Sequence, residues 1–126
     1  MWTVEIDEDF EPEFLALSHE VQNEAFAMMR LLQQFGPQLR RPHADTLANS
    51  KHANMKELRF GADDGVWRIA FAFDTQRKAI LLVAGDKSGV GQKTFYRELI
   101  RKADLRFDAH LKRIAKEKKG HGTKRK

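Results

Sequence analysis

Apolar residues in the first third of the chain alternate at strand spacing and then recur at helical spacing. Residues 2–6 alternate apolar with polar side chains, which predicts a short strand with one buried face. Residues 11–17 hold a proline near their start and one apolar side, which predicts a short helix. Ser18 suits an N-cap, and apolar residues then recur every three to four positions as far as Phe35, before Gly36-Pro37 ends the helix.

The second part of the chain predicts a loop, three strands and a last helix. Residues 37–54 are polar and irregular and predict a long surface loop. Three strands follow over 55–60, 66–73 and 78–85, separated by short turns rich in polar residues. Apolar positions at helical spacing then predict a helix that starts near Gln92.

These elements predict an α+β fold with the order β-α-α-β-β-β-α. The middle strand carries large side chains on one face, while Ala70 and Ala72 lie on the other. We expect a curved, mostly antiparallel sheet with helices packed on one side. Residues 1–114 form a single predicted domain, and residues 115–126 are predicted to fray into a disordered basic tail.

Composition excludes several classes of protein. The chain has 126 residues and no cysteine, which excludes a disulfide scaffold, a Cys-ligated zinc site and a thiol nucleophile. The longest apolar run, 79–84, is too short to span a membrane, and residues 1–7 lack a basic n-region, so a cytoplasmic protein is expected. The five histidines, read as surface residues, lack metal-site spacing, and Gly85–Gly89 lacks the spacing of a phosphate-binding P-loop. No serine lies in a nucleophile elbow, and no metal or cofactor is expected.

Charge is distributed unevenly along the chain. The net charge is +5, but residues 112–126 alone carry +7, which leaves −2 for residues 1–111. Residues 1–24 hold eight acidic residues and no lysine or arginine. A strongly basic end is typical of contact with nucleic acid, although a solubilising tail would have the same composition.

Basic residues also gather on the predicted strands. Lys56, Arg59 and Arg68 lie on adjacent strands, and Lys87 follows the third strand. Like charges so close destabilise a sheet unless an anion neutralises them, and a phosphate backbone is such an anion. Arg68 interrupts an apolar strand, where an unpaired charge is costly. The alternative interpretation is that Arg68 pairs with a carboxylate at the sheet edge, namely Glu57 or Asp86.

A family resemblance follows from these strands. The segments 56–59, 67–74 and 79–87 resemble the toxins of the RelE/ParE superfamily, and in particular the HigB-like, phage-derived Gp49 branch. The resemblance covers residues 2–112 in element order and is most specific over residues 55–103. It implies a small microbial-RNase-like α+β fold, in agreement with the predicted order.

The resemblance implies a toxin of a type II toxin–antitoxin pair. Its partner would be a cognate antitoxin, a helix-turn-helix DNA-binding protein encoded next to it. RelE-like members are endoribonucleases that cut mRNA in the ribosomal A site, and we expect this activity here. ParE-like members poison gyrase without nuclease chemistry, and an inactive phage-derived module that binds RNA or a partner is a third class.

The resemblance also implies the site. The family arginine maps onto Arg68, which would stabilise the phosphoryl transition state as the ribose 2′-OH attacks. Lys56 is the expected general base and Glu57 its substitute, while Lys87 would bind phosphate or protonate the 5′-oxygen. Tyr96 would stack on a base. Many members carry a second basic residue where this chain has Ser88. The residues expected to bind RNA are Arg59, Lys93, Arg97, Lys112, Arg113 and Lys116.

Overall fold

One mixed sheet organises the chain. The computed structural model describes residues 1–124, with side chains described as far as Lys118. Its elements, in chain order, are β1 (Val4–Ile6), α1 (Glu11–Leu15), α2 (His19–Phe35), the 3-10 turn η1 (Gly36–Gln38), β2 (Ala44–Thr46), β3 (Lys56–Ala62), β4 (Gly65–Phe73), β5 (Ala79–Asp86) and α3 (Gln92–Lys124). The five strands lie in the order β1-β5-β4-β3-β2, with β1 parallel to β5 and the other pairs antiparallel. The predicted α+β class is confirmed.

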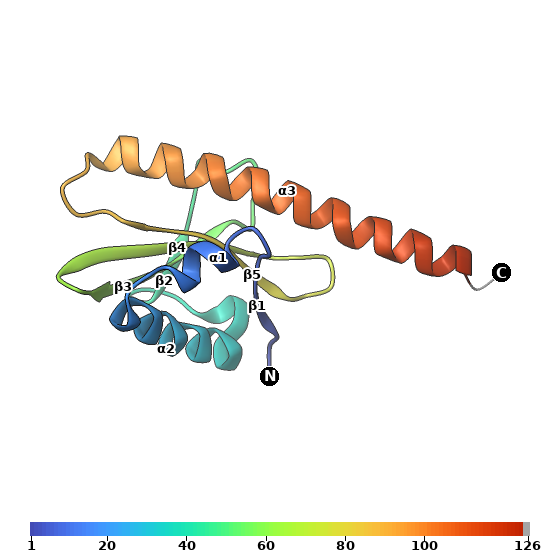
Figure 1. The fold of residues 1–126 in the computed structure, drawn as a ribbon, viewed down its shortest axis with the longest axis horizontal. Coiled ribbons are helices and arrows are strands. Elements are labelled where there is room, and N and C mark those ends of the chain that lie inside the picture. The colour runs from blue at the N-terminus through green and yellow to red at the C-terminus, as the bar shows by residue number, and fades with distance from the viewer. Residues whose placement is uncertain (125–126) are drawn as a thin grey trace.

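Helices cover both faces of this sheet, whereas the sequence predicted helices on one side. Figure 1 shows α3 above the strands and α2 below them. The alternation along β4 explains this arrangement. Ile69 and Phe71 pack into the core between the sheet and α2, while Ala70 and Ala72 pack into the core between the sheet and α3. The two alanines leave room for large α3 side chains such as Phe95 and Phe107. Small residues on one strand face therefore mark a helix contact.

The segment predicted as a surface loop, 37–54, contains η1 and the edge strand β2. Leu39, Ala44 and Leu47 from this segment are buried. They anchor the segment to the two cores, but they are too few and too irregularly spaced to show a period in the sequence. The N-cap prediction is confirmed, because the Ser18 hydroxyl accepts a hydrogen bond of 3.2 Å from the Val21 amide.

The last helix is longer than expected. It continues to Lys124, past the point near residue 115 where the sequence predicted fraying. Residues 115–118 are alanine, lysine and glutamate, all strong helix formers, which accounts for the difference. Residues 125 and 126, the end of the predicted tail, lie outside the described residues. Within residues 1–124 no helix is both long enough and apolar enough to cross a membrane.

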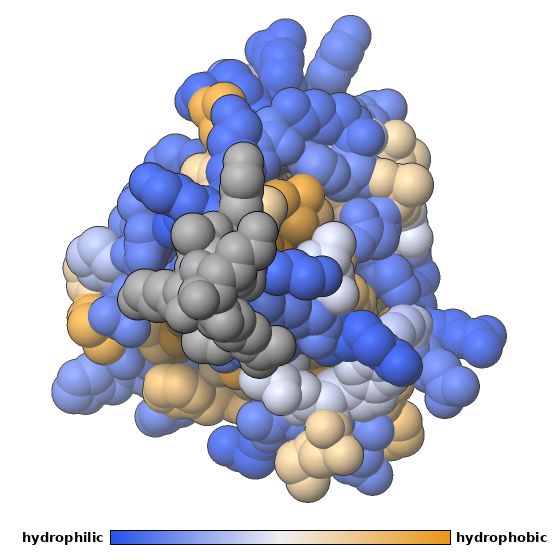
Figure 2. Space-filling view, turned by 90° about the vertical axis from the view of Figure 1, so that its right-hand side faces the viewer, coloured by the Kyte–Doolittle hydropathy of each residue, from blue (hydrophilic) through white to orange (hydrophobic). Residues whose placement is uncertain are grey.

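Acidic residues near the N-terminus hold the middle of α3. Glu13 on α1 accepts a hydrogen bond of 2.9 Å from Arg106, and the buried Asp7 carboxylate accepts one of 2.8 Å from Arg113. Burial raises the pKa of Asp7, while the Arg113 guanidinium opposes this shift. Figure 2, seen from the end toward which α3 points, shows a mostly hydrophilic surface with apolar side chains in small separate groups. Some of the acidic residues near the N-terminus therefore pair with basic residues of α3 within the molecule.

Candidate functional site

Three charged residues on β3 and β4 form the centre of the site. The strand register places Arg59 directly opposite Arg68, and Glu57 lies two residues away on the same face of β3. One Glu57 oxygen, Oε2, accepts a hydrogen bond of 2.9 Å from Arg59 Nη1. The other, Oε1, lies 3.6 Å from Arg68 Nε. The carboxylate therefore compensates the repulsion between two arginines on adjacent strands.

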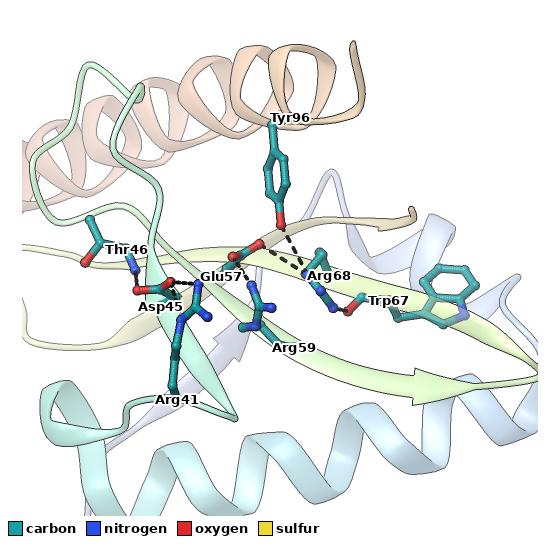
Figure 3. A network of polar contacts seen from close by, with 8 residues as sticks. All are labelled: Arg41, Asp45, Thr46, Glu57, Arg59, Trp67, Arg68 and Tyr96. Atoms are coloured by element: carbon teal, nitrogen blue, oxygen red, sulfur yellow. Dashed lines mark hydrogen bonds and ion pairs between the residues drawn. The ribbon is translucent and has the colours of Figure 1, made fainter. Parts of the chain in front are cut away.

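Arg68 is part of the protein interior. It is 6% exposed and Glu57 is 3% exposed. Arg68 Nη1 donates to the Trp67 carbonyl at 2.9 Å, and Nε donates to the Tyr96 hydroxyl at 3.2 Å, as Figure 3 shows. Of the two carboxylates considered in the sequence, Glu57 is the ion-pair partner. Asp86 instead accepts hydrogen bonds from the backbone amides of Val66 and Ser88.

Tyr96 covers this ion pair from α3. Its ring comes down from the helix, and its hydroxyl points at Arg68 and Glu57 (Figure 3). Burial raises the pKa of Tyr96, the hydrogen bond from Arg68 opposes that shift, and the Glu57 carboxylate adds to it. The phenol therefore stays protonated at neutral pH and can donate a hydrogen bond. Stacking of the Tyr96 ring on a base stays a prediction.

A basic groove opens above the ion pair. It has a volume of about 910 Å³ and lies between the first turns of α3, the first half of β3 and the segment 46–49. Among the described residues that line it, Glu57 is the one carboxylate. Six cationic side chains line it: Arg41, Arg59, Lys87, Lys93, Arg97 and Arg101. Such a charge balance attracts a polyanion.

The structure brings together some of the predicted residues and separates others. Arg59, Lys87, Lys93, Arg97 and Tyr96 all line the groove together with Glu57. Lys87 Nζ lies 5.9 Å from the centre of the Tyr96 ring. Arg68 does not line the groove and lies beneath its floor, so of the two arginines paired with Glu57 it is Arg59 that faces the groove.

Lys56 lies on the opposite face of the sheet. It alternates with Glu57 along β3, and its Nζ donates to the Pro37 carbonyl at 3.1 Å. It lines a separate pocket together with Arg40 and Asp45. The sequence-based grouping of Lys56 with Arg68 is therefore wrong, because neighbouring residues on a strand point to opposite faces.

Three of the residues expected to bind RNA lie on the distal part of α3. Arg113 forms ion pairs with Asp7 at 2.8 Å and Glu8 at 3.3 Å, so its charge is used within the fold. Lys112 and Lys116 are exposed, and Lys112 is about 24 Å along the helix from Tyr96 at 1.5 Å per residue. These residues are not part of the groove.

Sequence reasoning missed two groove arginines and two structural histidines. Arg101 follows Arg97 by four residues, so the helical period could have placed it in the same stripe. Arg41 lies in the irregular segment before β2, where no period exists. His52 and His110, read as surface histidines, bond the carboxylates of Asp108 and Asp74, each at 2.8 Å.

Comparison with known proteins places this chain in a family. Residues 12–108 match the family described as phage derived protein Gp49-like. The chain is 40% identical over 111 residues to the putative toxin HigB2 of Mycobacterium tuberculosis strain H37Rv, a match that covers 87% of this chain and 54% of HigB2. It is 43% identical over 98 residues to the putative toxin HigB3 of the same organism, covering 78% of this chain and 83% of HigB3. The chain thus spans about half the length of HigB2 and most of HigB3.

The fold is also that of a solved toxin. The free Escherichia coli toxin RelE, in a mutant form with two arginines replaced by alanine, superposes with a TM-score of 0.57 at 10% identity. The match covers 80% of this chain and 95% of RelE, and at this identity it shows the fold alone. From the matched residues and the identity to HigB2 and HigB3, the chain belongs to the phage-derived Gp49-like family of HigB-type proteins.

Proposed function

We propose that this chain is the toxin of a type II toxin–antitoxin pair and that it cuts mRNA on the ribosome in its basic groove. The observation that carries the proposal is a groove of six cations around one carboxylate and one protonated phenol. This set supplies phosphate binding, a proton acceptor and a proton donor without a metal ion. The naming of HigB2 and HigB3 as putative toxins supports the same biological role.

The proposed reaction is attack of a ribose 2′-OH on the adjacent phosphate. Glu57 is the proposed general base. Glu57 is the one carboxylate among the described residues that line the groove, so it is the acceptor that a bound 2′-OH would meet. The O–P bond to the 2′-oxygen forms as the bond to the 5′-oxygen breaks, which leaves a 2′,3′-cyclic phosphate and a free 5′-OH. Lys87 would protonate the departing 5′-oxygen.

Two side chains would stabilise the negative charge that develops on the phosphoryl oxygens. Arg59 faces the groove and is already oriented by its hydrogen bond to Glu57. Its planar fork suits two phosphoryl oxygens at once. The Tyr96 hydroxyl can donate to a third oxygen, because the pKa of Tyr96 is raised. Arg68 is proposed as a positioning residue that holds both Glu57 and Tyr96.

The remaining cations would hold the RNA strand. Lys93, Arg97 and Arg101 recur every four residues and form one stripe on the groove side of α3, and Arg41 lies across the groove. A groove with cations on two walls suits a single strand, whose phosphates can contact both. Lys112 and Lys116, exposed farther along α3, would add contacts to ribosomal RNA phosphates without sequence preference.

Induced expression is expected to stop translation first, with mRNA cut inside reading frames. The measurement is primer extension on cellular mRNA, together with incorporation of labelled amino acids and labelled thymidine. Arrest of DNA synthesis before translation, with mRNA intact, would instead support the gyrase poison. Unimpaired growth with intact mRNA would support the inactive binding module.

The proposed partner is an antitoxin with a helix-turn-helix DNA-binding domain, encoded by the neighbouring gene. Co-expression of that gene is expected to restore growth, and the two proteins should copurify as a complex. Its contact with the toxin should also block RNA binding, since the groove is the basic surface that an acidic segment would occupy. Failure of the two proteins to copurify would count against the pairing.

A further inference from the structure

One wall of the basic groove is a segment without regular structure between β2 and β3. Residues 47–49 of this segment, with Thr46 at the end of β2, line the groove opposite the stripe of Lys93, Arg97 and Arg101. The two ends of the segment are held together by the Leu47 amide, which donates to the Met55 carbonyl at 3.0 Å. The side chains of Leu47 and Met55 are also buried in the core between the sheet and α3. Figure 1 shows this segment rising from the sheet to α3.

The outer end of the segment is fastened to α3 by two carboxylates. Asp104 accepts hydrogen bonds from the Ser50 hydroxyl at 2.5 Å and from the Lys51 amide at 3.2 Å. Asp108 pairs with the Lys51 ammonium group and with His52 Nε2, the latter at 2.8 Å. The hydrogen bonds from Lys51, first, and from His52 hold the pKa of Asp108 below its usual value, which agrees with a carboxylate that stays ionised.

The helical period relates these carboxylates to the groove. Asp104 and Asp108 follow Arg101 by three and seven residues, so they continue the stripe that lines the groove. The charge of the stripe reverses after Arg101, at the point where the segment 50–52 crosses onto the helix. The other side of α3 is held independently, through Arg106 and Glu13 on α1. The outer end of the segment is therefore fastened to the helix beside the groove.

We propose that Asp104 and Asp108 are positioning residues that clasp the segment 47–54 to α3 and thereby set the separation between the two walls of the basic groove for a single strand of RNA. The inference deepens the proposed function and rests on it for the identity of the ligand. Simple electrostatics makes the opposite prediction, because each carboxylate repels phosphate and its removal alone should tighten RNA binding. Weaker RNA binding after removal of a carboxylate therefore supports the positioning role, whereas tighter binding supports simple electrostatics.

The experiment compares Asp104→Ala with Glu98→Ala. Both remove one carboxylate three residues from Arg101 on the same helix, and Glu98 is exposed and pairs with Arg101 rather than with the segment. Alanine is the best helix former, so neither change weakens α3. Binding of a fluorescein-labelled single-stranded RNA is measured by anisotropy, and amide hydrogen exchange of residues 47–54 is measured by mass spectrometry.

We expect Asp104→Ala to bind RNA about threefold to tenfold more weakly than the wild type. The net free energy of about one hydrogen bond corresponds to a change in affinity of this size. Glu98→Ala should bind as tightly as the wild type or more tightly. Exchange should accelerate in the segment only for Asp104→Ala. Equal affinity of the two variants, or unchanged exchange, would overturn the clasp. A wild-type protein that binds no RNA would instead overturn the proposed function, while the exchange comparison would still test the clasp.

Discussion

Replacing Arg68 with alanine is expected to abolish RNA cleavage and to destabilise the fold by about 3–5 kcal/mol, the range for breaking a buried ion pair. Glu57 is 3% exposed, and the substitution would leave its charge without the guanidinium 3.6 Å away. Tyr96 would also lose the hydrogen bond from Arg68 Nε. Stability is measured by urea denaturation, and cleavage is measured on ribosome-bound mRNA with folded protein at low temperature.

A second variant separates the two effects. Glu57→Gln combined with Arg68→Met removes both charges and keeps the volume of both side chains, so most of the lost stability should return. Cleavage should stay absent, because both the proposed base and the group that positions it are gone. Arg30→Ala on the exposed side of α2 is the control and should change neither property. An Arg68→Ala protein with wild-type stability would contradict the buried ion pair.

Glu57→Asp is expected to lower the cleavage rate about 10²-fold to 10⁴-fold, the usual contribution of a general base. The shorter side chain keeps the charge that compensates Arg59 and Arg68 but withdraws the acceptor oxygen from the groove floor. Because the six groove cations are unchanged, RNA affinity should stay within a few-fold of the wild type. The measurement is single-turnover cleavage of ribosome-bound mRNA at saturating protein, with RNA affinity determined separately by anisotropy.

The conservative control for this substitution is Glu98→Asp, an exposed glutamate on α3. It should cleave at the wild-type rate. A Glu57→Asp protein that also cleaves at the wild-type rate would show that Glu57 is a structural counterion and that another group accepts the 2′ proton. A parallel loss of affinity and rate would indicate that the shorter side chain displaces Arg59 rather than the base.

Local patterns in the sequence determine most of the elements. Ser18 and Gly36 bound α2 as predicted, because an N-cap hydroxyl and a glycine with φ of +56° act within one helical turn. The three consecutive strands follow from apolar alternation and polar turns, and the residues of these strands indicated the family. Each of these signals depends on residues a few positions apart.

The site depends on contacts between distant residues, which only the tertiary structure decides. Period-two alternation shows that Lys56 and Glu57 face opposite sides of a strand, but the packing of α3 onto the sheet decides which side carries the groove. The burial of Arg68 requires Tyr96, which lies 28 residues away, to cover it. Likewise, the segment 47–54 becomes a groove wall only through carboxylates on α3 more than fifty residues later. Sequence spacing fixes the face of a side chain, whereas long-range packing fixes what that face meets.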